Sequence, residues 1–139
     1  MKKILLTVVS QEKQLIKTKV DQITAPTAEG EITILPKHVA LFSKLKEGEL
    51  IYVDGIKEDS LVISNGFITV SPNSEVTVMV DSAKMAREIS LSKAEEAVKA
   101  AKETMTHSVD RRELLMAEAS LKKAMLEIRV AQKSKITKI

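Results

Sequence analysis

The chain has 139 residues and a formal net charge of +3, and it contains no cysteine. This length suits one domain or a small domain with an appendage, and the absence of cysteine excludes disulfides and cysteine-based metal sites. No apolar run approaches the ~20 residues of a membrane-spanning helix, and the short run Ile4–Val9 after Lys2 and Lys3 is typical of a strand and not of a signal peptide. We therefore expect a soluble chain that is not exported.

Glycine and proline divide the chain into two parts. All four glycines and all three prolines lie before residue 73, and residues 84–139 contain neither. Helix interiors exclude both residue types, whereas β-rich segments use them at turns. The sequence thus predicts a β-domain over residues 1–83 and a helical tail over residues 84–139.

The early part of the chain alternates short apolar runs with turn signals. Asp54-Gly55 and Asn65-Gly66 each predict a hairpin turn, and residues 39–45 form an apolar connection. Many short strands at this spacing favour an all-β sandwich or flattened barrel. The expected strands cover residues 3–9, 15–20, 21–25, 32–35, 49–53, 61–64, 67–70 and 75–80.

An acidic turn lies between two of these strands. Gly30 stands between Glu29 and Glu31, as expected where the backbone needs a positive φ or another chain approaches closely. Ile32 and Ile34 then alternate with polar residues, and Pro36 ends the ladder or marks a sheet edge because it has no amide hydrogen. We expect an exposed acidic loop.

The tail predicts two helices in an antiparallel hairpin. The first has an apolar stripe at spacings of three and four residues, with a capping box formed by Ser92 and Glu95. A polar turn at residues 106–110 ends it, and Asp110 is a good N-cap for the second helix. Because alanine buries little area, the contact between the helices should be weak enough to open. The stripe residues are Leu91, Ala94, Val98, Ala101 and Met105, followed by Leu114, Ala117, Leu121, Ala124, Ile128 and Ala131.

The residues that could carry catalysis are few. His38 and His107 are the two histidines, and no metalloprotease, nucleophile-elbow or P-loop pattern occurs. His38 is better explained as a structural or contact residue than as a general base. We therefore expect a chain that is not an enzyme.

Four segments together closely resemble the epsilon subunit of the F-type ATP synthase. They read APTAEGEITILPKHVALF at residues 25–42, LKEGEL at 45–50, SNGF at 64–67 and VMVDSA at 78–83. The resemblance implies a β-sandwich followed by a helix hairpin. Thr33 and Lys37, where the family often has glycine, and Ala40, where it often has proline, depart from the pattern and affect mainly the flexibility of the loop.

The resemblance also implies partners and a place of action. Such a subunit lies at the foot of the central stalk, on the cytoplasmic side of the cell membrane, and associates with the membrane indirectly through the ring of c subunits. Residues Glu29, Gly30 and Glu31 would face the c-ring. The gamma subunit would contact His38, Val39, Ala40, Leu41 and Phe42. The helices would restrain ATP hydrolysis by contacting the catalytic alpha and beta subunits, with Arg111, Arg112, Lys122, Lys123 and Arg129 meeting an acidic segment of beta.

Some bacterial relatives bind ATP at the hairpin through an Ile-Asp-x-x-Arg-Ala pattern, and the matching stretch here is ISLSKA at residues 89–94. Ile89, Lys93 and Lys123 are the matching candidates for a nucleotide site. Ser90 replaces the acid, Lys93 replaces the arginine, and Glu127 stands where an arginine is expected. A carboxylate repels phosphate and lysine lacks the arginine fork, so we expect ATP binding to be weak or absent, and no other cofactor.

A different class of function remains open on the residues alone. The tail carries a net charge of +5, against −2 for residues 1–83. A basic helical tail is usually a solvated surface, but it can also bind nucleic acid, an anionic membrane or an acidic protein. The acidic β-domain has no row of exposed aromatic residues for base stacking, which argues against a nucleic-acid-binding or adaptor module.

Overall fold

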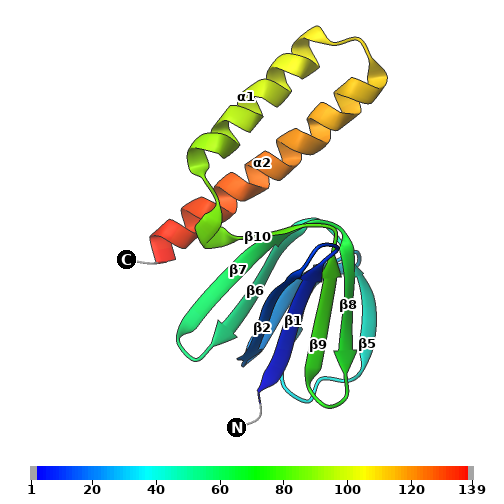
Figure 1. The fold of residues 1–139 in the computed structure, drawn as a ribbon, viewed down its shortest axis with the longest axis vertical. Coiled ribbons are helices and arrows are strands. Elements are labelled where there is room, and N and C mark those ends of the chain that lie inside the picture. Colours follow the sequence, from blue (N-terminus) through cyan, green and yellow to red (C-terminus); the bar gives the residue numbers. More distant parts are fainter. Residues whose placement is uncertain (1–2, 138–139) are drawn as a thin grey trace. The chain divides into compact units, whose positions relative to one another are not determined.

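A computed structural model describes the backbone of residues 3–137 and the side chains of residues 3–133. The chain divides into two compact units, Met1–Lys84 and Met85–Ile139, and each is described by itself. The first is a β-sandwich and the second consists of a short 3-10 helix and two α-helices (Figure 1).

Within the described residues, ten strands form one sheet that curls into the sandwich. Its hydrogen-bonded order is β10-β7-β6-β3-β5-β8-β9-β1-β2, and β4 pairs with β3 outside this path. β1 and β9 run parallel, and β2 lies close to β6 because the sheet curls back on itself. The strands are β1 (Ile4–Ser10), β2 (Gln14–Val20), β3 (Gln22–Thr27), β4 (Gly30–Ile34), β5 (Leu41–Leu45), β6 (Gly48–Asp54), β7 (Lys57–Ile63), β8 (Gly66–Ser71), β9 (Glu75–Val80) and β10 (Ala83–Met85).

Alternation of apolar and polar residues builds the core of the sandwich. In β9, Val76, Val78 and Val80 are buried while the residues between them are exposed, as the period of two in a strand requires. The fully buried side chains are large and mostly branched. They include Ile4, Leu6, Ile23, Ile34, Leu45, Leu50, Leu61, Ile63 and Ile68.

The turn at Asp54-Gly55 is confirmed. Asp54 pairs with Lys57, so Gly55 and Ile56 form a two-residue hairpin between β6 and β7, and Gly55 has a φ of +66°. Pro36 also follows the end of β4, as predicted.

The prediction of a hairpin at Asn65-Gly66 was wrong. β7 pairs with β6, whereas β8 pairs with β5 and β9, so the chain crosses to another part of the sheet at this point. A Cβ atom at Gly66 would lie 2.0 Å from the Met79 carbonyl oxygen. The close approach of β9 therefore explains this glycine. The expected connection over residues 39–45 was also wrong in part, because Leu41–Leu45 is strand β5 between β3 and β8.

The second unit is a helical hairpin preceded by η1 (Ala86–Glu88). Its helices are α1 (Leu91–His107) and α2 (Arg111–Thr137). The predicted stripes are confirmed, because Ala94, Ala101, Ala117, Ala124 and Ala131 are buried. Met105 is 40% exposed, and the stripes miss the buried Leu126 and Val130.

The N-cap of α1 differs from the prediction, whereas the N-cap of α2 agrees with it. Ser90, and not Ser92, is the N-cap of α1, since its Oγ accepts the backbone N–H of Lys93 at 3.3 Å. The predicted capping box fails because the helix already begins at Leu91. Asp110 caps α2 as predicted, with its Oδ1 accepting the Arg112 N–H at 3.0 Å.

Candidate functional site

The acidic turn joins β3 to β4. Thr27 pairs with Gly30, so Ala28 and Glu29 form the tip, and Gly30 has a φ of +124° that suits glycine. The Ala28 N–H donates to the Lys44 carbonyl oxygen at 2.9 Å, and the buried Thr27 hydroxyl donates to the Gly30 carbonyl oxygen. Both the tip and its base are thus fixed to the sheet. Glu29 and Glu31 are exposed, so two carboxylates face water from a turn whose backbone is hydrogen-bonded to the sheet.

The loop after β4 contains a second turn. The His38 N–H donates to the Leu35 carbonyl oxygen at 3.1 Å, Pro36 occupies the second position, and Lys37 has a φ of +66°. These features match a type II turn, whose third position favours glycine. His38 is half-buried, with its Nδ1 2.7 Å from the Val39 carbonyl oxygen. Val39 is 75% exposed.

An apolar patch lies on the outer face of β5, β8 and β9. It consists of Phe42, Phe67 and Met79, which are 66%, 43% and 46% exposed. Phe67 pairs directly with Met79 across β8 and β9. The rings of Phe42 and Phe67 stack with centroids 5.5 Å apart. We call these three residues the outer apolar patch. Exposed aromatic and thioether side chains grouped in this way are typical of protein interfaces.

Sequence reasoning found Phe42 but missed Phe67 and Met79. A signal for Met79 was available: because Val76, Val78 and Val80 share the buried face, Met79 must point outward. Phe67 joins it through the pairing of β8 with β9, and this register depends on contacts that the strand pattern alone does not reveal.

The acidic turn and the Leu35–His38 turn lie at opposite ends of β4. Five residues of extended strand, Gly30–Ile34, separate them, or about 16 Å. The Leu35–His38 turn, which leads into residues 38–42, therefore lies away from the acidic turn.

An ion cluster joins Lys3, which precedes β1, to the β2–β3 and β6–β7 turns of the sandwich. Lys3 Nζ lies 3.2 Å from Asp21 Oδ1 and also contacts Asp54, while the Gly55 N–H donates to Asp21 Oδ2 at 2.6 Å. The hydrogen bond from Gly55, followed by that from Lys3, lowers the pKa of Asp21. Hydrogen bonds to Asp54 and Asp21 raise the pKa of Lys3. The cluster is exposed and serves the fold.

The predicted basic contacts all lie exposed on α2. Because an α-helix turns ~100° per residue, Arg111, Lys122 and Arg129 share one stripe and Arg112 and Lys123 share another. Lys122 lies 3.7 Å from Glu118 one turn earlier, so part of its charge is already balanced. Arg111 and Arg129 remain the strongest candidates on their stripe.

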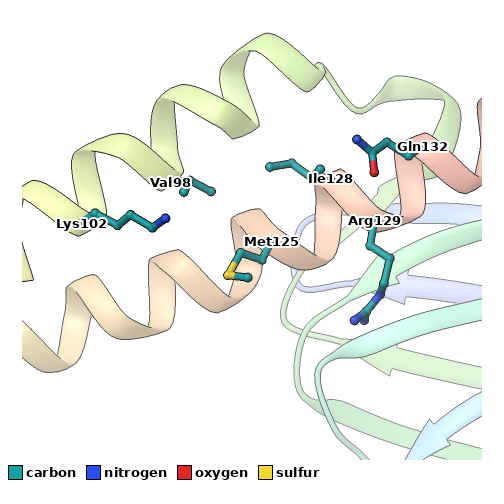
Figure 2. A pocket seen from close by; sticks show the side chains of 6 residues that line it. All are labelled: Val98, Lys102, Met125, Ile128, Arg129 and Gln132. Carbon is teal, nitrogen blue, oxygen red and sulfur yellow. The ribbon is translucent and has the colours of Figure 1, made fainter.

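A groove of about 290 Å³ lies between α1 and α2 (Figure 2). Its apolar lining comes from both helices, and Lys102 extends along it. The groove is lined by Val98, Lys102, Met125, Ile128, Arg129 and Gln132.

The predicted nucleotide residues do not line this groove. Ile89 is half-buried in the extended segment before α1, Lys93 lies in the first turn of α1 and Lys123 is exposed on α2. Ser90, which stands at the acid of the family pattern, serves as the N-cap.

Within residues 3–133, no group of three or more histidine, aspartate or glutamate side chains could hold a metal ion. Among the described residues, no helix is long and apolar enough to cross a membrane.

Two family models cover nearly the whole chain. Residues 3–86 match the β-sandwich domain of the ATP synthase delta/epsilon chain, and residues 87–132 match its long α-helix domain. This chain belongs to the ATP synthase delta/epsilon chain family. It is accordingly a non-catalytic ATP synthase subunit of the epsilon type, as its motifs and fold predicted.

Curated relatives match this chain over nearly their whole length. The ATP synthase epsilon chain of Dehalococcoides mccartyi is 41% identical over 134 residues, which cover 96% of this chain and 95% of the relative. That of Syntrophobacter fumaroxidans is 36% identical over 132 residues, covering 95% and 98%.

Solved structures share the fold. A chain in the Euglena gracilis mitochondrial ATP synthase, solved with OSCP, F1 and the c-ring, matches with a TM-score of 0.77 at 29% identity, covering 96% of this chain and 81% of that chain. A chain in the central stalk and c-ring structure of the Tetrahymena thermophila mitochondrial ATP synthase shares the fold with a TM-score of 0.56 at 17% identity, and 96% of each chain is covered.

Proposed function

We propose that this chain is the central-stalk subunit of a proton-translocating F-type ATP synthase that couples rotation of the c-ring to ATP synthesis and restrains ATP hydrolysis. The observation that carries the proposal is the match of both parts of the chain, in order, to the two domains of one subunit. In this proposal residues 1–83 dock the subunit and residues 84–139 regulate the enzyme. The subunit lies on the cytoplasmic side of the cell membrane, held there through the c-ring.

The c-ring binds the acidic turn at Glu29, Gly30 and Glu31. This contact is supported by the hydrogen bonds that hold the backbone of the turn, because a turn that is already ordered loses little backbone conformational entropy on binding. Reversing both charges, with Glu29→Lys and Glu31→Lys, should reduce proton pumping driven by ATP hydrolysis in inverted membrane vesicles. Glu58→Lys with Glu75→Lys makes the same charge reversal at exposed positions elsewhere on the sandwich and should leave proton pumping unchanged. Equal effects of the two pairs would contradict this contact.

The gamma subunit binds the predicted segment His38–Phe42 together with the outer apolar patch. Clustered exposed aromatic residues are the usual anchors of such interfaces. Phe42→Ser should weaken binding of purified gamma ~10-fold or more, the loss expected for an aromatic anchor. Ile56→Ser alters a fully exposed apolar residue in the β6–β7 turn and serves as the matched control.

The brake on hydrolysis acts through the exposed basic stripe of α2. Several pairs must act together, because a single surface ion pair contributes little. Removing Arg111 and Arg129 together (both →Ala) should relieve inhibition of the purified catalytic headpiece. Lys99→Ala with Lys102→Ala removes the same charge from α1 and should leave inhibition intact.

ATP is not a strong ligand of the hairpin in this proposal. The replacement of acid by Ser90 and the carboxylate of Glu127 support it. Calorimetry with full-length chain should detect no dissociation constant below millimolar, and a tighter constant would contradict this part of the proposal.

A further inference from the structure

Among the residues that the structure describes, two other than glycine occupy the left-handed region of the backbone, and they are hydrogen-bonded to each other. Lys37, in the Leu35–His38 turn, has a φ of +66°, and Ser74, in the turn between β8 and β9, has a φ of +62°. The Lys37 N–H donates to Ser74 Oγ at 3.0 Å. This bond joins segments 37 residues apart in the chain.

The bond satisfies a donor that the turn itself leaves unused. In the Leu35–His38 turn the internal hydrogen bond runs from the His38 N–H to the Leu35 carbonyl, so the Lys37 N–H points elsewhere. Ser74 offers an acceptor from a fixed position. The Leu5 N–H of β1 donates to the Ser74 carbonyl at 2.9 Å, and the Ser74 N–H donates to the Ser71 carbonyl at 3.2 Å.

We call the hydrogen bond from the Lys37 N–H to Ser74 Oγ the tether. It matters because a lysine is unfavourable at this position of the turn. The third position of a type II turn favours glycine, and a residue with a Cβ is held there only when its surroundings enforce the conformation. Without the tether the loop would sample other conformations. The residues that follow this turn, His38–Phe42, are those proposed to contact gamma.

We propose that Ser74 is a positioning residue that holds the Leu35–His38 turn in the conformation the gamma subunit recognises. This inference rests on the proposed docking of gamma. Ser74 acts through Lys37 and need not touch gamma, because a loop already ordered before binding loses less entropy on association.

The first test is hydrogen exchange of individual backbone amides in the full-length chain, followed by NMR. Ser74→Ala removes the hydroxyl and should accelerate exchange of the Lys37 amide ~3–10-fold, the loss expected for one hydrogen bond. The Leu5 amide should keep its protection, since it bonds to the backbone of residue 74. Ser71→Ala is the matched control, because it removes a hydroxyl of the same turn that donates to Asn73 Oδ1 and does not accept the Lys37 N–H. Unchanged exchange of Lys37 in Ser74→Ala would overturn the tether.

The second test separates positioning from general stability. Ser74→Gly also removes the hydroxyl but relieves the positive φ, so the melting temperature should stay equal or rise while gamma binding weakens ~3–10-fold. Adding Lys37→Gly to Ser74→Ala should restore gamma binding, because glycine adopts the turn without help. Gamma affinity that follows the melting temperature across these variants would overturn the positioning role.

The two proposals can fail separately. If Phe42→Ser leaves gamma binding unchanged, the docking surface is wrong, and the Lys37 exchange still reports whether the tether exists. If Phe42→Ser weakens gamma binding and Ser74→Ala does not, gamma docks there without needing Ser74, and the positioning role is wrong.

Discussion

The core of the sandwich and the contact between helices α1 and α2 are built from different side chains. We call this helix contact the seam of the hairpin. All the largest fully buried side chains, from Ile4 to Val76, lie in the sandwich. The seam buries mainly alanines, such as Ala101 and Ala124. Each buried methylene stabilises by ~0.8 kcal/mol, so an alanine seam gains much less than an isoleucine core of equal length. We therefore expect the hairpin to open at a lower free-energy cost than the sandwich.

The largest effect should come from truncating the core of the sandwich. Ile68 is fully buried in β8, so Ile68→Ala should lower the free energy of unfolding by ~2–5 kcal/mol through lost burial and the cavity left behind. Chemical denaturation of the full-length chain measures it. Thr69→Ala, at the exposed neighbouring position, should change stability by ~0.5 kcal/mol or less. A small effect of Ile68→Ala would contradict the claim that large buried side chains stabilise the sandwich more than alanines stabilise the hairpin.

Overpacking the seam should affect the hairpin alone. Ala124 is 3% exposed, and Ala124→Leu forces the helices apart at a cost of ~1–3 kcal/mol. Hydrogen exchange should quicken in α1 and α2 while the strands keep their protection. Ala119→Leu, on an exposed face of α2, is the control. Equal loss of protection in the strands would mean that the two units unfold together.

Removing the cap of α2 should be milder. Asp110→Ala deletes the acceptor for the Arg112 N–H and should cost ~1 kcal/mol of helix stability. The loss should appear as faster amide exchange in the first turn of α2. Asp110→Asn keeps an acceptor and should retain most of the protection, and equal behaviour of the two variants would count against the cap.

The smallest effect concerns the ion cluster of the sandwich, and its sign follows from the pKa of Asp21. Because the folded state lowers this pKa, Asp21 stabilises above its unfolded value of ~3.9, and the contribution is lost as the pH falls through the folded pKa. Asp21→Asn should therefore lower the melting temperature at neutral pH. The difference in melting temperature between Asp21→Asn and wild type should shrink below about pH 4. A difference that stays constant with pH would show that the charge of Asp21 is not its cause.

The raised pKa of Lys3 sets the alkaline end of the pH range in which the ion cluster stabilises the fold. Its contribution is present below the unfolded value of ~10.4 and is lost as the pH rises through the folded pKa. The melting-temperature difference between wild type and Asp21→Asn should therefore narrow again at strongly alkaline pH.

The sequence predicted the parts of the fold that depend on local chemistry. Asp54-Gly55, Asp110 and the helical stripes follow from turn, cap and periodicity rules, and the structure confirms them. The prediction from Asn65-Gly66 was wrong because the same dipeptide suits both a hairpin turn and a close approach of two strands. Only the pairing of β8 with β9 distinguishes these cases.

The candidate site was predicted in part for the same reason. The exposed acidic turn was predicted from a single stretch of sequence, whereas Phe42 was named as a gamma contact only because the chain resembles the epsilon subunit. Sheet register brings Phe67 and Met79 together beside Phe42, and a contact between turns brings Ser74 to Lys37. Such contacts between distant segments leave no local pattern.

The most direct test of the account is ATP hydrolysis by the purified catalytic headpiece with its gamma subunit. Full-length chain is compared with a truncation that ends at Lys84, the last residue of the sandwich unit. The account predicts that both proteins bind and that only the full-length chain inhibits. Equal inhibition by both would assign the brake to the sandwich and contradict the division of roles. Failure of both to bind would contradict the central-stalk function itself.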